Sequence, residues 1–266
     1  MANFTAQDVK KLREATSAGM LDCKKALIAA DGDFDTAVDN LRKAGIAKAG
    51  KKADREANEG LAHAITDGPK KGALVLVSCE TDFVAKNATY QAYVAEVAEK
   101  ALATAGNGDV TAALNAAEEE NLKAKIAVIG ENMKIPKAVS WESAGAVSSY
   151  IHAAGKVGVL VDVEGDFDDE LLKSLGMHIA AFRPLYLNAE EVPAADLERE
   201  RAIFADKAAG KPAEIAEKII QGSIQKWYKE VCLVQQGWIM DDKVAIEKKF
   251  PNLKINRFAR LAAGTN

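Results

Sequence analysis

The chain has 266 residues, of which 28% are charged, 48% are hydrophobic and only 6% are aromatic. This length predicts about two domains with a sizeable core, and a composition rich in Ala, Lys and Glu is typical of a globular, largely helical protein. The formal net charge of -4 argues against nucleic acid as the main partner, because proteins that bind nucleic acid carry a basic surface. We therefore expect a protein or small-molecule partner.

The first segment predicts a bundle of short helices. Thr5, followed by Asp8 three residues later, predicts a capping box at the start of the first helix. Ser17-Ala-Gly19 is expected to break this helix, and Asp22 is expected to cap a second one. Three helices this short can close only a very small core. The segment resembles a ubiquitin-associated domain.

A third helix is predicted after Asp31-Gly-Asp33, with its end at Gly45. Residues 46–58 are charged and have no large apolar side chain after the first position, which predicts a linker. Asp31-Gly-Asp33 also begins like a calcium loop, but Thr36 and Arg42 occupy the positions at which such a loop needs Gly and Glu. We therefore expect a capped helix turn here and no calcium site.

The middle of the chain contains an internal repeat. Residues 60–83 predict a strand, a turn and a second strand, and residues 145–167 repeat this plan at almost the same spacing. Each is followed by a helical run, at 89–105 and at 168–182. The repeat predicts two related half-domains, each a hairpin whose sheet has one face buried under helices.

Two further helical runs, 194–207 and 212–229, predict an antiparallel helical hairpin, with Gly210 after the first run and Pro212 at the start of the second. Its apolar stripe is thin, so we expect the hairpin to project outward. The chain then predicts a strand at 231–239, a short helix at 244–250 and a last strand at 255–261.

The predicted fold class is therefore α+β, with an N-terminal three-helix ubiquitin-associated-like domain, a core of two related hairpin-plus-helix half-domains and an inserted helical hairpin. The expected boundaries are 1–54 for the ubiquitin-associated-like, partner-binding domain, 55–142 for the N-terminal half of the core, 143–190 with 231–266 for its C-terminal half, and 191–230 for the inserted coiled-coil hairpin.

Motifs for catalysis and for cofactor binding are missing from the sequence. Gly210-Lys211 lacks the upstream glycine of a phosphate loop, so we expect no direct nucleotide binding. The cysteines and histidines are too scattered for a disulfide framework, a thiolate metal site or a catalytic group: Cys23, Cys79, Cys232, His63, His152 and His178. We expect no enzyme, no catalytic residue, no metal and no cofactor.

The start of the chain has no basic segment followed by an apolar run, and no stretch of about 18 apolar residues occurs in the sequence. We therefore expect no contact with a membrane. The expected location is the cytoplasm, a reducing compartment.

The segment Cys79-Glu-Thr-Asp-Phe-Val-Ala-Lys-Asn87 lies where the second predicted strand stops and a helix begins. This placement puts Asp82 and Phe83 at an edge turn. Two interpretations are open: Asp82 caps a helix while Phe83 fills the core, or the pair presents an acid and an aromatic anchor to a partner, as interface hot spots do.

Thr81-Asp-Phe-Val-Ala-Lys-Asn87 resembles a signature of the elongation factor Ts family. Other segments resemble the same family in order along almost the whole chain: residues 12–27, 125–132, 149–161, 177–181, 210–218 and 256–258. The resemblance implies the same modules as those predicted above, from the ubiquitin-associated-like domain to the inserted coiled coil.

The resemblance also implies a function. Members of this family bind elongation factor Tu in its GDP form and promote GDP release, and the residues that match Thr81, Asp82, Phe83 and Val84 disturb the Mg²⁺ and phosphate-binding region of that partner. Further contacts with elongation factor Tu map onto Arg13, Met20, Leu21 and His152, where Met20 and Leu21 are expected in a loop after Gly19. The chain would thus be a guanine-nucleotide exchange factor that acts by binding, during translation elongation.

Two other functions remain open at this point. One is a ubiquitin-associated-like adaptor that binds a protein surface without exchange activity, which would have no need of an acid and an aromatic aimed at a metal site. The other is RNA binding, which the acidic charge balance and the lack of a basic stripe with interleaved aromatics disfavour.

Overall fold

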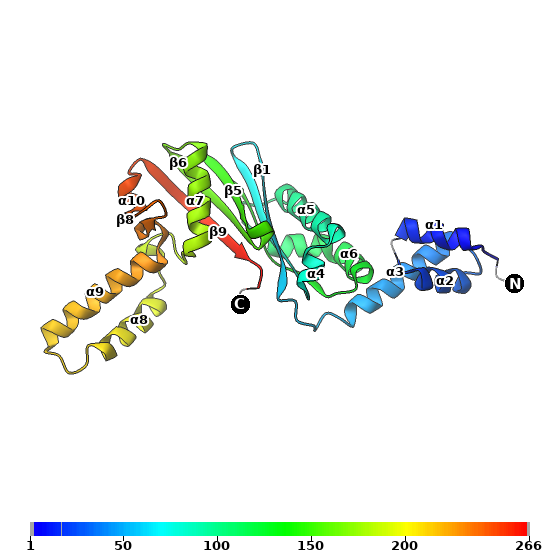
Figure 1. Cartoon of the computed structure of the whole chain (residues 1–266), viewed down its shortest axis with the longest axis horizontal. Coiled ribbons are helices and arrows are strands. Elements are labelled where there is room, and N and C mark those ends of the chain that lie inside the picture. Colours follow the sequence, from blue (N-terminus) through cyan, green and yellow to red (C-terminus); the bar gives the residue numbers. More distant parts are fainter. Residues whose placement is uncertain (1–2, 17, 265–266) are drawn as a thin grey trace. The chain divides into compact units, whose positions relative to one another are not determined.

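The structure is a computed structural model that describes residues 3–16 and 18–264 (Figure 1). Ser17, part of the expected break after the first helix, lies outside the described residues, as do the outermost residues of the first and last expected domains. The chain divides into two compact units. The first comprises residues 1–63, 75–140 and 262–266, and the second comprises residues 64–74 and 141–261.

The chain begins with three helices, as predicted: α1 (Ala6–Thr16), α2 (Met20–Ala29) and α3 (Phe34–Gly50). The capping box is confirmed, because the backbone N–H of Thr5 donates to the Asp8 carboxylate at 2.8 Å and the N–H of Asp8 donates to the Thr5 hydroxyl at 3.3 Å. The predicted cap at Asp22 is wrong. Gly19 is the N-cap of α2, and Asp22 lies in the first helical turn, where a negative charge favours the helix dipole.

The third helix is longer than predicted. It begins at a cap that the sequence indicated, with the N–H of Thr36 donating to Asp33 at 2.8 Å, but it continues through Gly45 to Gly50. Gly45 has a structural role inside the helix, because a Cβ added there would lie 2.9 Å from the Cβ of Ala127 in α6. The missing side chain lets α3 and α6 approach closely. The helix continues past Gly45, and the predicted linker is therefore wrong for residues 46–50, which are helical.

The first hairpin of the repeat belongs to a four-stranded sheet. Its second strand ends at Cys79, and a single helical turn, α4 (Asp82–Ala85), precedes the longer helix. Tyr90 of that helix is fully buried, and its hydroxyl donates to the Val77 carbonyl at 2.6 Å, which ties the helix to the second strand. The other elements are β1 (Glu59–Asp67), β2 (Lys71–Cys79), α5 (Ala88–Ala103), β3 (Gly108–Asp109), α6 (Thr111–Ile129) and β4 (Met133–Glu142).

The second hairpin is β5 (Ala146–His152) and β6 (Val157–Gly165), which pair antiparallel with Ala146 opposite Val163 and His152 opposite Val157. The helix α7 (Asp169–Phe182) packs on it (Figure 1). A later strand, β9 (Leu253–Ala262), lies next to β6, just as β4 lies next to β2. The strand orders are β1-β2-β4-β3 and β5-β6-β9. Both sheets thus contain a hairpin with a later strand beside its second strand, as expected for related halves. The fold is α+β.

The helices α8 (Ala194–Lys207) and α9 (Ala213–Val231) lie side by side as a helical hairpin (Figure 1). The strand predicted at 231–239 is correct only at its end. The helix α9 runs to Val231, a short 3-10 turn that buries Leu233 follows, and only Gly237 and Trp238 form a strand, which pairs antiparallel with the next one. The remaining elements are η1 (Ala153–Gly155), η2 (Ala189–Glu191), η3 (Leu233–Gln235), β7 (Gly237–Trp238), β8 (Asp241–Ala245) and α10 (Ile246–Lys249).

Within the described ranges, no helix is both long and apolar enough to cross a membrane. The same ranges contain no group of three or more His, Cys, Asp or Glu side chains that could hold a metal ion.

Candidate functional site

The residues Thr81–Val84 form a turn at the start of α4, as the sequence indicated, and of these four only Phe83 is exposed while the others are partly buried. The Phe83 side chain is 80% exposed, so the interpretation that it fills the protein's own core is wrong. Asp82 precedes it as the first helical residue, and Ala85, which ends α4, is buried. The turn therefore presents an acid and an aromatic side chain outward while its far end is anchored inward.

A side-chain cap lies on each side of this turn, one at the start of α4 and one at the start of α5. Thr81 is the N-cap of α4, and its hydroxyl accepts a hydrogen bond from the N–H of Val84 at 3.4 Å. Asn87 caps the next helix, α5, by accepting from the N–H groups of Thr89 at 2.8 Å and Tyr90 at 3.4 Å. Side-chain oxygens therefore satisfy free backbone donors at the start of α4 and at the start of α5.

The carboxylate of Asp82 forms an ion pair with Lys86, one helical turn later, at 2.7 Å. The hydrogen bond with Asp82 raises the pKa of the Lys86 ammonium group. Because water reaches both side chains, it screens this pair and the pair contributes little to stability.

Glu131, in the loop between α6 and β4, is a feature that the sequence did not reveal. Its carboxylate accepts hydrogen bonds from the N–H groups of Glu80 at 3.1 Å and Thr81 at 3.0 Å, and from the Thr81 hydroxyl at 2.6 Å. In return, the Glu80 carboxylate accepts from the N–H of Asn132 at 2.6 Å. No short motif predicts this pairing, because Glu80 and Thr81 lie about fifty residues from Glu131 in the chain.

The candidate residues Arg13, Met20 and Leu21 lie on the N-terminal helices. Arg13 is exposed in the last turn of α1, where its charge favours the helix C-terminus. Met20 and Leu21 form the first turn of α2 rather than a loop, but they are 46% and 72% exposed. Two large apolar side chains that remain in water next to each other are typical of a protein-binding surface.

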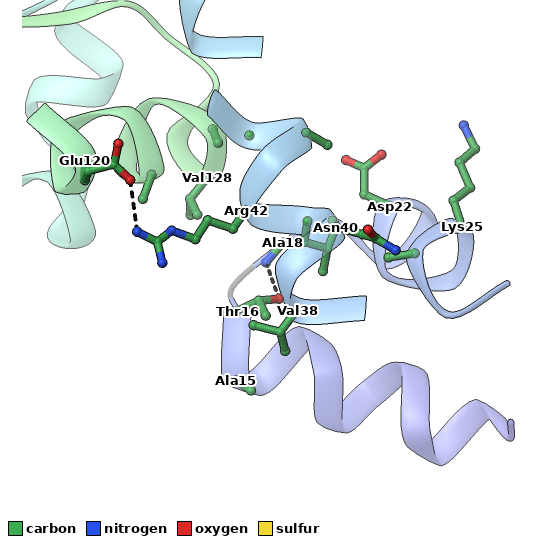
Figure 2. Close-up of a pocket in the computed structure, with 17 residues that line it drawn as sticks. Ala15, Thr16, Ala18, Asp22, Lys25, Val38, Asn40, Arg42, Glu120 and Val128 are labelled. Atoms are coloured by element: carbon green, nitrogen blue, oxygen red, sulfur yellow. Dashed lines mark hydrogen bonds and ion pairs between the residues drawn. The ribbon is translucent and has the colours of Figure 1, made fainter. Parts of the chain in front are cut away.

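A pocket of about 500 Å³ opens next to this surface, between the N-terminal helices and α6 (Figure 2). Its walls are mostly small apolar residues, including Ala15, Ala18 and Gly19. At its edge the Arg42 guanidinium group donates to the Glu120 carboxylate at 2.9 Å, as Figure 2 shows.

His152 lies in the second compact unit, whereas the other candidate residues lie in the first. It is exposed at the end of β5, and its Nδ1 is 3.2 Å from the Tyr150 hydroxyl. The two rings stack with centroids 6.0 Å apart. This contact orients the imidazole at the end of the hairpin.

The other two histidines are packed. His178 is fully buried between Phe182 and Trp238, with ring centroids at 4.5 Å and 5.6 Å. Its Nε2 is 2.9 Å from the Gln236 amide oxygen, and burial lowers the pKa of its imidazole. Burial also lowers the pKa of His63. These environments favour neutral, structural side chains.

Comparison with known proteins shows one family throughout. Residues 80–265 match the family described as "Elongation factor TS". The chain is 47% identical over 268 residues to elongation factor Ts of Actinobacillus pleuropneumoniae serotype 3, with 99% of this chain and 92% of the relative covered. It is 42% identical over 283 residues to elongation factor Ts of Clostridium botulinum strain Alaska E43, covering 98% and 93%. For elongation factor Ts of Haemophilus influenzae strain PittGG the identity is 46% over 268 residues, covering 99% and 92%.

Proposed function

The chain belongs to the elongation factor Ts family, and on this premise we propose that it is a guanine-nucleotide exchange factor that binds elongation factor Tu in its GDP form and promotes GDP release. The turn Thr81–Val84 disturbs the Mg²⁺ and phosphate-binding region of that partner. The observation that carries this assignment is the side chain of Phe83, which is 80% exposed on a turn whose start is capped by Thr81.

Exchange of this kind needs no covalent chemistry. A factor that binds nucleotide-free elongation factor Tu more tightly than the GDP form must weaken GDP binding by the same factor, because coupling between two ligands is reciprocal. In nucleotide-binding proteins, a magnesium ion and a row of backbone amides hold the phosphates. A side chain that shifts this loop removes several charge-assisted contacts together, so a small wedge has a large effect on GDP affinity.

In this scheme Phe83 and Asp82 have different tasks. Phe83 supplies the apolar surface that enters the partner and displaces the phosphate loop. Asp82 brings a negative charge toward the oxygen ligands of the Mg²⁺. The residues Arg13, Met20, Leu21 and His152 supply affinity from other parts of the chain. The cytoplasm, where translation takes place, is the proposed location.

The experiment is to follow the release of a fluorescent GDP analogue from elongation factor Tu by stopped flow, at saturating Mg²⁺ and with excess unlabelled GDP. We expect release to accelerate with the concentration of the chain, and substoichiometric amounts to act on many partner molecules. The double variant Arg13→Ala, Met20→Ala should need a higher concentration for the same rate.

If the chain bound elongation factor Tu but left GDP release at its spontaneous rate, the adaptor function would replace the exchange function. If the double variant matched the unmodified chain at every concentration, Arg13 and Met20 would not belong to the interface.

A further inference from the structure

The helix that presents Phe83 is too short to be stable by itself. A single turn such as α4, four residues long, fixes several backbone dihedrals for very few internal hydrogen bonds, so its formation is unfavourable without outside help. The direction in which Phe83 points must therefore be determined by groups outside the turn.

Glu131 provides the main contact from outside. One carboxylate oxygen accepts from the backbone N–H groups of Glu80 and Thr81, and the other accepts from the Thr81 hydroxyl. Hydrogen bonds to a carboxylate are stronger than those between neutral groups. Because the hydroxyl has only one proton, its donation to Glu131 leaves an oxygen lone pair for the N–H of Val84. One side chain thus orders the backbone before the turn and the cap within it.

Glu131 is itself held in place. It follows Gly130, which ends α6 in the left-handed conformation with φ of 91° and whose carbonyl accepts from the Lys52 ammonium group. Asn132, which comes next, is buried, and its amide donates to the carbonyls of Ala53 at 3.2 Å and Arg55 at 2.6 Å. The loop 130–132 therefore joins the segment after α3 to the base of the turn.

We propose that Glu131 is a positioning residue for exchange: its carboxylate holds the start of α4 and so sets the direction in which Phe83 enters elongation factor Tu. This inference rests on the proposed function and adds to it a residue that acts through Thr81. Both oxygens of Glu131 are occupied by donors of its own chain, which fits support of the turn.

The test uses the stopped-flow assay at a series of concentrations of the chain, which separates the maximal rate of GDP release from the half-saturating concentration. We expect Glu131→Ala to lower the maximal rate about tenfold, since small displacements of a positioned group are costly, with little change in half-saturation. Glu131→Gln should recover most of the rate, because an amide of the same shape keeps an oxygen for the two backbone N–H groups.

The matched control is Glu119→Ala. Glu119 is an exposed glutamate on α6 that pairs with Lys123 at 2.6 Å, and its removal should change neither quantity. Melting curves of all variants accompany the kinetics, and rates are expressed per folded molecule.

A double variant gives the sharpest result. If Glu131 acts only through the turn, Glu131→Ala should cause no further loss of maximal rate in a chain that already carries Phe83→Ala. Losses that multiply would overturn the proposal, as would a normal rate per folded molecule for Glu131→Ala.

The failure of each idea is distinguishable. An unmodified chain that does not accelerate GDP release refutes the proposed function and the positioning role with it. A chain that accelerates release and is slowed by Phe83→Ala but not by Glu131→Ala refutes the positioning role alone.

Discussion

Replacing Phe83 by alanine should separate exchange from stability. Since the side chain is 80% exposed, only about a fifth of it is removed from water when the chain folds. With about 200 Å² for a phenylalanine side chain and about 25 cal/mol per Å², the lost stability is at most about 1 kcal/mol. The expected fall in melting temperature is therefore no more than about 4 °C.

The effect on exchange should be much larger. If a partner covers the remaining side chain, about 160 Å² of apolar surface becomes buried, worth about 4 kcal/mol at most. Hot-spot residues lose at least about 2 kcal/mol on truncation, which corresponds to about a 30-fold slower GDP release at a fixed concentration of the chain. Most of this slowing should remain when the variant and the unmodified chain are compared at the same Mg²⁺ concentration and the same fraction of folded molecules.

The assay combines thermal melting with stopped-flow release of fluorescent GDP. The matched control is Phe167→Ala, because Phe167 follows the second strand of the second hairpin as Phe83 follows that of the first, and is 38% exposed. We expect this control to release GDP at the unmodified rate per folded molecule. A large loss of melting temperature for Phe83→Ala, about the size that 3 to 5 kcal/mol of core truncation would cause, with normal exchange would refute the reasoning.

Asp82→Ala should slow GDP release less than Phe83→Ala, and its defect should shrink when EDTA has removed Mg²⁺; an undiminished defect would contradict a role at the metal. Gly45→Val should destabilise the chain by about 1 to 3 kcal/mol in urea unfolding, because the added side chain meets Ala127, whereas unchanged stability would show that α3 and α6 can separate freely. Burial raises the pKa of the Cys232 thiol to about 11 from an ordinary value near 9. The stability that the buried, protonated thiol contributes is therefore present below pH 9 and lost as the pH rises toward 11. Rapid chemical modification of this thiol in the native chain at pH 8 would contradict its burial. The chain alone should bind neither GDP nor GTP, and calorimetry that detected micromolar affinity would disprove this.

The parts of the fold that follow local rules could be predicted from the sequence. The cap at Thr5, the cap at Asp33 and the run 194–207 depend on residues within one or two helical turns, and each was confirmed. The turn before α5 was also predicted, because a strand stops there and a helix begins, whereas the exposure of Phe83 was left open.

The errors arise where distant packing decides. Gly45 has the appearance of a helix end, but its lack of a side chain serves the contact with Ala127, 82 positions away in the chain. The helix α6 went unpredicted because its buried residues include Glu118 and its other face is charged, so no clear apolar stripe marks it. The apolar run after Val231 resembles a strand although the chain there turns into η3.

The candidate site was predicted only in part for the same reason. The exposed side chains Asp82 and Phe83 belong to one continuous motif, which could be recognised. Glu131 could not be assigned a role, because any of 39 acidic residues could in principle have accepted the N–H groups before α4. Such a partner follows from the tertiary structure.

The capped turn around Phe83 also has a thermal consequence. Because the turn exposes the Phe83 ring in the free chain, the ring stays hydrated until a partner covers it. Association should therefore carry a negative change in heat capacity, the signature of apolar surface leaving water. Since the hydrophobic contribution weakens on cooling, this part of the contact should loosen in the cold while the polar contacts around it do not.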